Sequence, residues 1–230
     1  MDVNKKLHGE SKIHLREDGT EPYHATAARR PPRAQEKACK QLLTELLESK
    51  VIEAVEEPTE WCAPAHFVPK PGSEGKMRLV TDYTLLNRQV KRPIHGFSTA
   101  QEIRQQLKPD STMYLVADLV HGYFQNALDK ESSKLTTFIV NVGEGTRRFK
   151  YLRSPMGLSA SGDEFCRKTD QAVEGLEKTF KLIDDVLIEG SSEEELYKNA
   201  EEFLKRAKAA DITISKRKIQ IGPKVKFGGS

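Results

Sequence analysis

The chain has 230 residues, of which 37% are hydrophobic and 31% charged, and its formal net charge is +3. This length can bury the core of one or two domains, and the small net charge gives no strong indication of a nucleic-acid partner. Three widely spaced cysteines support neither a disulfide framework nor a zinc site, and no apolar run approaches the roughly 18 residues of a transmembrane helix. We therefore expect an intracellular, cytoplasmic protein without a membrane segment.

Basic residues gather in four stretches, whereas acidic residues dominate one. The basic stretches are 29–33, 70–78, 88–92 and 147–153, and the acidic one is 193–202. Local basic surface is what a phosphate backbone requires. Solvated loops and helix faces explain any single cluster equally well, so both interpretations stay open.

The first half of the chain predicts an extended lead-in followed by alternating helices and strands. Residues 1–34 are polar, and apolar residues at helical spacing over 35–50 predict an amphipathic helix. Two strands are expected at 61–70 and 76–83, joined by a turn that contains Gly and Pro. A short helix should begin with a capping box at Ser98–Gln101 and end near residue 107.

The second half predicts more strands and two longer helices. A strand at 113–119 would carry Tyr114, Val116 and Asp118 on one face. The further expected elements are a hairpin at 136–152, a helix at 161–177, a hairpin at 179–188 that turns at Asp184–Asp185, a helix at 191–210, and short strands at 211–215 and 225–228. Because this order lacks a regular βαβ rhythm, we expect an α+β fold with a mixed sheet.

Three aspartates lie in short apolar runs that would otherwise be buried strands. These are Asp118 and the pair Asp184–Asp185. A buried unpaired carboxylate is costly, so such groups usually bind a metal or pair with a cation. Two such strands side by side would make a site for hard divalent cations, Mg²⁺ above all. The alternative is local, since Asp-Asp is common in hairpin turns and Asp118 could cap the turn that follows it.

A site of this kind suits phosphoryl transfer. Two Mg²⁺ ions about 3.5–4 Å apart can bind the attacking and the leaving oxygen of an in-line displacement. Carboxylates bridge the two ions, while phosphates and waters complete the octahedra. The aspartates therefore predict two-metal phosphoryl chemistry.

Several sequence blocks occur in a familiar order. The central ones are Asp-Leu-Val-His-Gly-Tyr-Phe-Gln at 118–125, Ser-Pro-Met-Gly-Leu at 154–158 with Phe165, and Ile-Asp-Asp-Val-Leu-Ile at 183–188; earlier blocks lie at 58–61, 68–72 and 78–87. Together they resemble reverse transcriptases, and the resemblance is closest to those of gypsy-type long-terminal-repeat retrotransposons. It extends from about residue 20 to the end of the sequence.

The resemblance implies a right-hand polymerase architecture that lacks the thumb. A palm, whose mixed or antiparallel sheet packs on helices, would be joined to a fingers subdomain. After the connector at 1–34, the fingers would span 35–91 and 126–160, and the palm would span 92–125 and 161–230. We expect the chain to be truncated before the thumb and to lack RNase H.

The resemblance also implies roles for the residues around the aspartates. Asp118 and Asp184 would be the main ligands of two Mg²⁺ ions, for which Mn²⁺ could substitute, and Asp185 would support the charge beside them. The backbone amides of His121 and Gly122 would face the incoming triphosphate. Tyr123 would lie under the nucleotide sugar and leave no room for a 2′-hydroxyl, although its residue type alone also fits a core tyrosine.

Further roles follow for the fingers and for the primer. Lys70 and Arg78 would hold the β- and γ-phosphates, the first as a point charge and the second as a bidentate fork. Without the resemblance, both would be interpreted as exposed cations at strand ends. Met156 and Gly157 would flank the nucleotide and the template base. Leu182 stands where the family has tyrosine or phenylalanine, at the position that contacts the primer end.

The expected function is RNA-directed DNA synthesis, in which deoxynucleotides are added to a primer 3′-end. The expected partners are an RNA or DNA template with its primer, deoxynucleoside triphosphates, and the thumb and RNase H segments of a polyprotein, and retroelement particles are one expected location. One alternative is an inactive relic that binds nucleic acid without polymerising. Another is a palm-fold nucleotidyl cyclase, which would not explain the fingers blocks.

Overall fold

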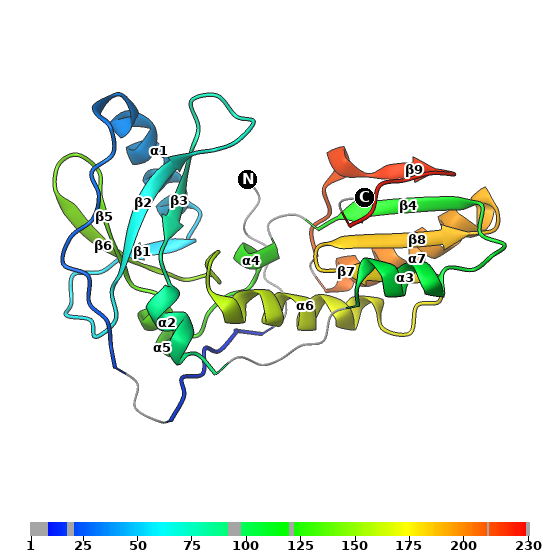
Figure 1. Ribbon diagram of the computed structural model, residues 1–230, viewed down its shortest axis with the longest axis horizontal. Coiled ribbons are helices and arrows are strands. Elements are labelled where there is room, and N and C mark those ends of the chain that lie inside the picture. The colour runs from blue at the N-terminus through cyan, green and yellow to red at the C-terminus, as the bar shows by residue number, and fades with distance from the viewer. Residues whose placement is uncertain (1–8, 18–20, 92–97, 120–121, 211, 229–230) are drawn as a thin grey trace. The chain divides into compact units, whose positions relative to one another are not determined.

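The fold is described from a computed structural model, which describes residues 9–17, 21–91, 98–119, 122–210 and 212–228 (Figure 1). The chain divides into two compact units, each of which is described by itself. The first unit comprises Gly9–Pro93 and Tyr123–Gly162, and the second comprises Ile94–Gly122 and Asp163–Ser230. None of the helices within the described ranges is long and apolar enough to cross a membrane.

The first unit is built on a five-stranded mixed sheet. Its order is β1-β6-β5-β2-β3, and β2 runs parallel to β5 while the other neighbours are antiparallel. The strands are β1 (Ile52–Ala54), β2 (Ala63–Pro69), β3 (Met77–Thr81), β5 (Phe138–Asn141) and β6 (Thr146–Tyr151). The predicted strands at 61–70 and 76–83 and the hairpin around Gly143 are confirmed, whereas the three-residue strand β1 was not predicted.

Aromatic packing holds the core of this sheet together. The ring of Phe138, which has no exposed surface, lies 5.8 Å from that of Phe149 and 5.1 Å from that of Tyr151. The buried hydroxyl of Tyr83 donates a hydrogen bond to the carbonyl of Thr136 at 2.8 Å. The helices of the unit are α1 (Glu36–Glu48), α2 (Thr84–Gln89) and α5 (Lys130–Leu135), and α4 (Gly122–Gln125) begins at its boundary. Of these, the sequence predicted α1.

The second unit contains a four-stranded antiparallel sheet. Its order is β7-β8-β4-β9, with β4 (Met113–Asp118), β7 (Thr179–Leu182), β8 (Asp185–Gly190) and β9 (Gln220–Gly222). The helices are α3 (Ala100–Gln106), α6 (Ser159–Val173) and α7 (Glu193–Ala209). This pattern of helices packed on mixed and antiparallel sheets confirms the predicted α+β class.

The two faces of β4 belong to different clusters, as its alternation predicted. Leu115 and Ala117 pack with residues of α6 and α7, such as Phe165 and Phe203. Val116, on the opposite face, packs with Ile103 of α3 and with other residues of a smaller cluster. The sheet is therefore covered on both sides, and Asp118 ends a strand that is anchored on both faces.

Three expectations for the second unit are wrong in detail. Thr99, and not Ser98, is the N-cap of α3, because its side chain accepts from the Glu102 amide while Glu102 accepts in return. Residues 225–228 form no strand; the edge strand is instead β9, which pairs with Val116. From the predicted strand at 211–215, Ile214 makes a single bridge to Leu119, while Asp211 lies outside the described residues.

Candidate active site

The pairing of β4 with β8 brings the predicted aspartates to one end of the sheet. Asp118, the last residue of β4, lies opposite Asp185, the first residue of β8. Beyond this pair, the amide of Leu119 donates to the carbonyl of Asp184 at 2.7 Å. The three acidic residues that the sequence singled out are thus neighbours in the second unit.

The turn between β7 and β8 differs from the one predicted. Leu182 pairs with Asp185, so the two turn residues are Ile183 and Asp184, and Asp185 belongs to the strand. Ile183 has a φ of 56°, whereas Asp184 does not have a positive φ. This pattern is that of a type II′ turn, which favours glycine at its first central position. A β-branched residue in the left-handed region is strained, so this strain is stored beside the aspartates.

Replacing Ile183 with glycine should relieve this strain. The left-handed conformation costs a side-chain-bearing residue about 1–2 kcal/mol, and the added freedom of glycine in the unfolded chain offsets about 0.5–1 kcal/mol of the gain. We expect Ile183→Gly to raise the free energy of unfolding by about 0.5–1 kcal/mol in urea denaturation. Ile219→Gly is the matched control, since Ile219 is also exposed but has a φ of −64°. The strain argument fails if both variants lose stability equally.

A lysine that the sequence analysis missed pairs with the first aspartate. The Nζ atom of Lys218 lies 2.8 Å from Oδ2 of Asp118, whose side chain is 18% exposed. The hydrogen bond to Asp118 raises the pKa of Lys218. The run Lys-Arg-Lys at 216–218 was the available signal, but nothing in it indicates which acidic group it meets.

The remaining electrostatics of the site are repulsive. Burial raises the pKa of Asp185, and the charge of Asp184 and then that of Asp118 act in the same direction. A hydrogen bond from the backbone amide of Gly228 and the charge of Lys218 act in the opposite direction. The surroundings of Asp185 therefore disfavour its charged form.

A pocket of about 360 Å³ opens beside the aspartates. It is lined by Val116, Asp118, Asp185, Arg217, Lys218, Ile219, Gln220 and Lys226. Two carboxylates and three cationic side chains thus line one cavity. Such a lining can receive a ligand that carries both a cation and phosphate groups.

The donor set fits a hard divalent cation by its chemistry. Carboxylate oxygens are the ligands that Mg²⁺ and Mn²⁺ prefer, and the pKa of Asp185 is raised by burial first and then by the charge of Asp184, both of which a bound cation would offset. Across the described ranges, however, no three His, Cys, Asp or Glu side chains are close enough together to hold a metal ion. Asp118 and Asp185 are the residues that would hold one, with the exposed Asp184 next to them.

The predicted phosphate-binding cations belong to the first unit. Lys70 follows β2, and its amide donates to the carbonyl of Lys76 at 2.8 Å to close the turn before β3. Arg78 lies on β3 opposite Val68, and both cationic side chains are exposed. They are therefore accessible on one hairpin, and their role in phosphate binding stays a prediction.

The predicted base-flanking loop is also in the first unit and is held by an asparagine. Asn87 donates to the carbonyl of Gly157 at 2.8 Å and accepts from the amide of Ser159 at 2.9 Å. Gly157 has a φ of 89°, a conformation that glycine adopts readily, and Met156 is 58% exposed. The side chain of Met156 is thus presented to solvent from a fixed loop.

The predicted residues after Asp118 are described only in part. His121 lies outside the described residues. Gly122 and Tyr123 begin the backbone of α4, but the side chain of Tyr123 is also outside the description. Their predicted nucleotide contacts therefore remain predictions. Leu182, in contrast, is described, and it packs against the cluster that contains Phe227.

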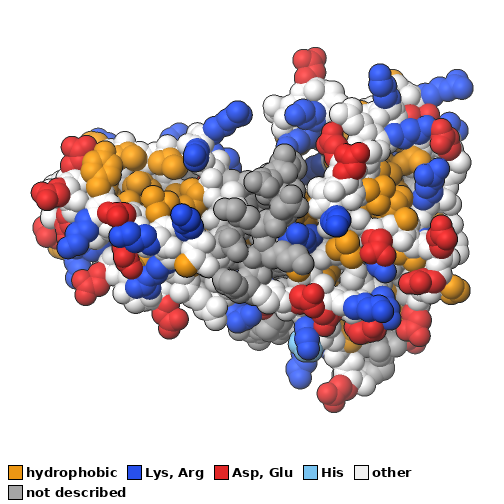
Figure 2. All heavy atoms as spheres, turned by 180° about the vertical axis from the view of Figure 1, so that it is seen from behind, with side chains coloured by type: hydrophobic (Ala, Val, Ile, Leu, Met, Phe, Trp, Pro, Cys, Tyr) orange, Lys and Arg blue, Asp and Glu red, His pale blue; other side chains and the backbone are white. Residues whose placement is uncertain are grey.

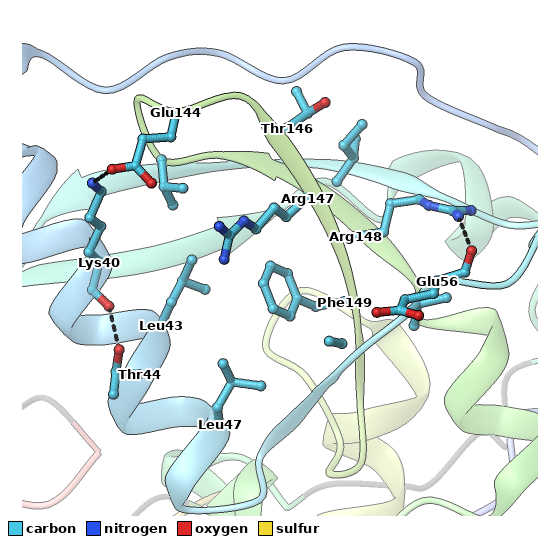
Figure 3. Close-up of a pocket in the computed structure, with 14 residues that line it drawn as sticks. Lys40, Leu43, Thr44, Leu47, Glu56, Glu144, Thr146, Arg147, Arg148 and Phe149 are labelled. Atoms are coloured by element: carbon cyan, nitrogen blue, oxygen red, sulfur yellow. Dashed lines mark hydrogen bonds and ion pairs between the residues drawn. The ribbon is translucent and has the colours of Figure 1, made fainter.

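A larger pocket of about 680 Å³ lies in the first unit and contains none of the predicted site residues (Figure 3). Arg147 extends over Leu43 of α1. At the rim, Lys40 pairs with Glu144, and Arg148 donates to the carbonyl of Glu56 at 3.0 Å. Three cationic and two acidic side chains line this pocket, the same numbers as in the pocket beside the aspartates.

Charges of both signs are also intermingled on the molecular face drawn in Figure 2. Within each unit, the described residues drawn there form no continuous basic surface. An extended anion such as a nucleic acid needs cationic groups along its path. The pocket beside the aspartates adds the paired carboxylates of Asp118 and Asp185, which could hold a divalent cation next to a phosphate, and it is therefore the better candidate for a phosphate-containing ligand.

Comparison with known proteins gives a consistent result. Residues 68–230 match the family model described as reverse transcriptase (RNA-dependent DNA polymerase). The chain is 34% identical over 167 residues, or 72% of its length, to the uncharacterized protein K02A2.6 of Caenorhabditis elegans. It is 26% identical over 213 residues, or 90% of its length, to the retrovirus-related Pol polyprotein from transposon 412 of Drosophila melanogaster. These matches cover 13% and 17% of the two relatives, so the chain spans a small part of either.

The fold is similar to that of solved viral enzymes. A foamy viral protease-reverse transcriptase in complex with double-stranded DNA matches 98% of this chain and 37% of its own, with a TM-score of 0.73 and 20% identity. The prototype foamy virus protease-reverse transcriptase matches 95% of this chain and 29% of its own, with a TM-score of 0.75 and 19% identity. At this identity the likeness concerns the fold.

Proposed function

This chain belongs to the reverse transcriptase (RNA-dependent DNA polymerase) family, and we propose that it adds deoxynucleotides to the 3′-end of a primer by two-metal-ion nucleotidyl transfer. The observation that carries the proposal is the pairing of Asp118 with Asp185, beside a pocket with three cationic side chains. We further propose that the chain comes from the polyprotein of a gypsy-type long-terminal-repeat retrotransposon and acts inside the cell.

In this proposal the second unit is the palm and the first unit is the fingers. Asp118, Asp184 and Asp185 would hold two Mg²⁺ ions, or Mn²⁺ in their place, and these would supply activation of the primer hydroxyl and charge neutralisation at the triphosphate. Lys218 leaves Asp118 when a cation binds there. Asp118 and Asp185 are fixed by their strands, so their carboxylates need little reorganisation on binding.

The remaining residues bind and orient the substrates. Lys70 and Arg78 are proposed to contact the β- and γ-phosphates, where an exposed lysine and an exposed arginine can donate charge-assisted hydrogen bonds. The amides of His121 and Gly122 face the same triphosphate. Tyr123 excludes a 2′-hydroxyl, so deoxynucleotides are selected.

Three contacts concern the template and the primer. Met156 and Gly157 lie against the nucleotide and the template base, and Leu182 supports the primer end. The shorter, aliphatic Leu182 offers less contact area than the aromatic residue of the family. The proposed partners are thus a template with its primer, deoxynucleoside triphosphates, and the thumb and RNase H segments of the polyprotein.

The proposal is tested by primer extension. With an RNA template primed by oligo-dT and all four deoxynucleoside triphosphates, we expect short extension products whose formation requires Mg²⁺ or Mn²⁺. Asp118→Asn and Asp184→Asn should each lower the rate by about 10²–10³-fold, since loss of a metal ligand removes several kcal/mol of transition-state stabilisation. Asp110→Asn is the matched control, because Asp110 is an exposed acidic residue of the same unit.

Two outcomes would overturn the enzymatic proposal. Extension that survives both site variants would remove the aspartates from the reaction. A salt-dependent gel shift of the primed RNA without incorporation at any Mg²⁺ or Mn²⁺ concentration would instead identify a relic that binds nucleic acid without polymerising.

A further inference from the structure

The side chain of Gln220 binds the backbone of the segment that follows β9. Oε1 of Gln220 accepts from the amide of Lys226 at 3.0 Å, and Nε2 of Gln220 donates to the carbonyl of the same residue at 3.2 Å. Gln220 itself lies on β9 opposite Val116 of β4. One side chain on the sheet therefore satisfies both backbone groups of a residue that belongs to no strand.

The next residue anchors the same segment on the sheet. Phe227 is 7% exposed and belongs to the cluster that contains Ile103, Val116 and Leu187. The two hydrogen bonds from Gln220 hold the backbone of Lys226, and burial of the ring holds Phe227, so two consecutive residues are fixed. The backbone that follows them is thus directed toward the end of the sheet where the aspartates lie.

Gly228 then makes two contacts with the candidate active site. Its amide donates a hydrogen bond to the carboxylate of Asp185. Its φ is 61°, and a Cβ atom at this position would lie 2.6 Å from Cδ2 of Leu182 and 3.4 Å from Cβ of Ala100. Glycine meets both demands, since it adopts this backbone conformation readily and leaves room for Leu182.

We propose that Gln220 and Gly228 are positioning residues for the candidate active site, which they serve by holding the Asp185 carboxylate and accommodating Leu182. The inference rests on the proposed function, because it assigns to Asp185 a role in the reaction. The hydrogen bond from the Gly228 amide to the carboxylate of Asp185 restricts the rotation of that carboxylate. A carboxylate fixed in this way is preorganised, and small displacements of such groups can cost about 10²-fold in rate.

The first experiment uses Gly228→Ala. The added methyl group strains the backbone at a φ of 61° and displaces the end of the Leu182 side chain, so we expect a roughly tenfold lower kcat for incorporation, with KM for the nucleotide within about twofold. Leu182→Ala removes the atom in the way but also the proposed primer contact, so Gly228→Ala should lower kcat less in a Leu182→Ala chain than in the parent chain. Gly175→Ala is the control: Gly175 has a φ of 73° and no atom within 4 Å of an added Cβ, so it shares the backbone strain without the collision.

The second experiment uses Gln220→Met, which preserves length but removes both hydrogen bonds. We expect faster amide hydrogen exchange at Lys226 and Gly228, and a lower kcat with little change in KM. Gln220 also lines the pocket, so a direct contact with the nucleotide would instead raise KM. An increase in KM alone, or unchanged kcat despite faster exchange, would overturn the positioning role.

The two proposals fail in different ways. If the parent protein incorporates no nucleotide, the proposed function is refuted. The geometry can still be tested by the amide exchange rates, and by whether Leu182→Ala restores the melting temperature that Gly228→Ala lowers. If incorporation is present and Gly228→Ala behaves like Gly175→Ala, the positioning proposal is refuted and the proposed function stands.

Discussion

Asp185→Asn is expected to raise the melting temperature of the metal-free protein while it lowers incorporation by about 10²–10³-fold. Asp185 is partly buried and close to the charges of Asp184 and Asp118, so its negative charge destabilises the folded protein. An asparagine keeps the size of the side chain and an acceptor for the Gly228 amide, but it removes the charge. The activity falls for the same reason, since the charge is what a divalent cation requires.

The measurement compares melting curves in EDTA with curves in Mg²⁺. The parent should gain more from Mg²⁺ than Asp185→Asn does, because ligand binding stabilises the folded state according to its affinity. Asp184→Asn serves as the comparison, since Asp184 is exposed and should change the melting temperature less. A lower melting temperature for Asp185→Asn in EDTA would contradict the electrostatic argument.

Asp170→Asn is expected to destabilise the second unit through a buried lysine on β7. The Nζ atom of Lys181 lies 2.7 Å from Oδ1 of Asp170 on α6, and the side chain of Lys181 is 4% exposed. Removing one partner of a buried pair costs about 3–5 kcal/mol, and we expect about 2–3 kcal/mol here because Asp170 is 38% exposed. Urea denaturation measures the loss.

Two further variants decide the cause. Lys181→Met combined with Asp170→Asn removes both charges, and we expect it to recover most of the stability. Glu201→Gln is the control for an exposed pair, since Glu201 and Lys205 are 68% and 64% exposed, and it should cost less than about 1 kcal/mol. If Asp170→Asn lowers the free energy of unfolding by no more than Glu201→Gln does, Lys181 does not depend on Asp170 to compensate its buried charge.

The aspartates could be predicted because their signal is local. Each lies at the end of a short, largely apolar run, where a buried strand would normally exclude a carboxylate. The pairing of Asp118 with Asp185 then follows from antiparallel register. Amphipathic helices such as α1 and α7 were predictable for the same reason, since their apolar residues recur at helical spacing.

The contacts that complete the site were not predictable from such patterns. Lys218 meets Asp118 across 100 positions of sequence, and Gln220 binds the backbone of Lys226 through its side chain. Neither contact produces a periodic pattern in the sequence, because a hydrogen bond to a distant side chain or to the backbone places no demand on the residue types next to it. The turn was misplaced for a related reason: propensity favours Asp over Ile at turns, but the register between β7 and β8 places Ile183 there.

The ion pair between Lys218 and Asp118 makes the uptake of a divalent cation an exchange. Lys218 has to release Asp118 before a cation can bind there. The apparent affinity for the cation therefore depends on how much more strongly Asp118 binds the cation than it binds Lys218. An anion that attracts the freed ammonium group, such as a triphosphate, shifts this exchange in favour of the cation. By reciprocity the cation would strengthen triphosphate binding by the same factor, and the two ligands would bind cooperatively through a lysine that pairs with Asp118 before the exchange and with the triphosphate after it.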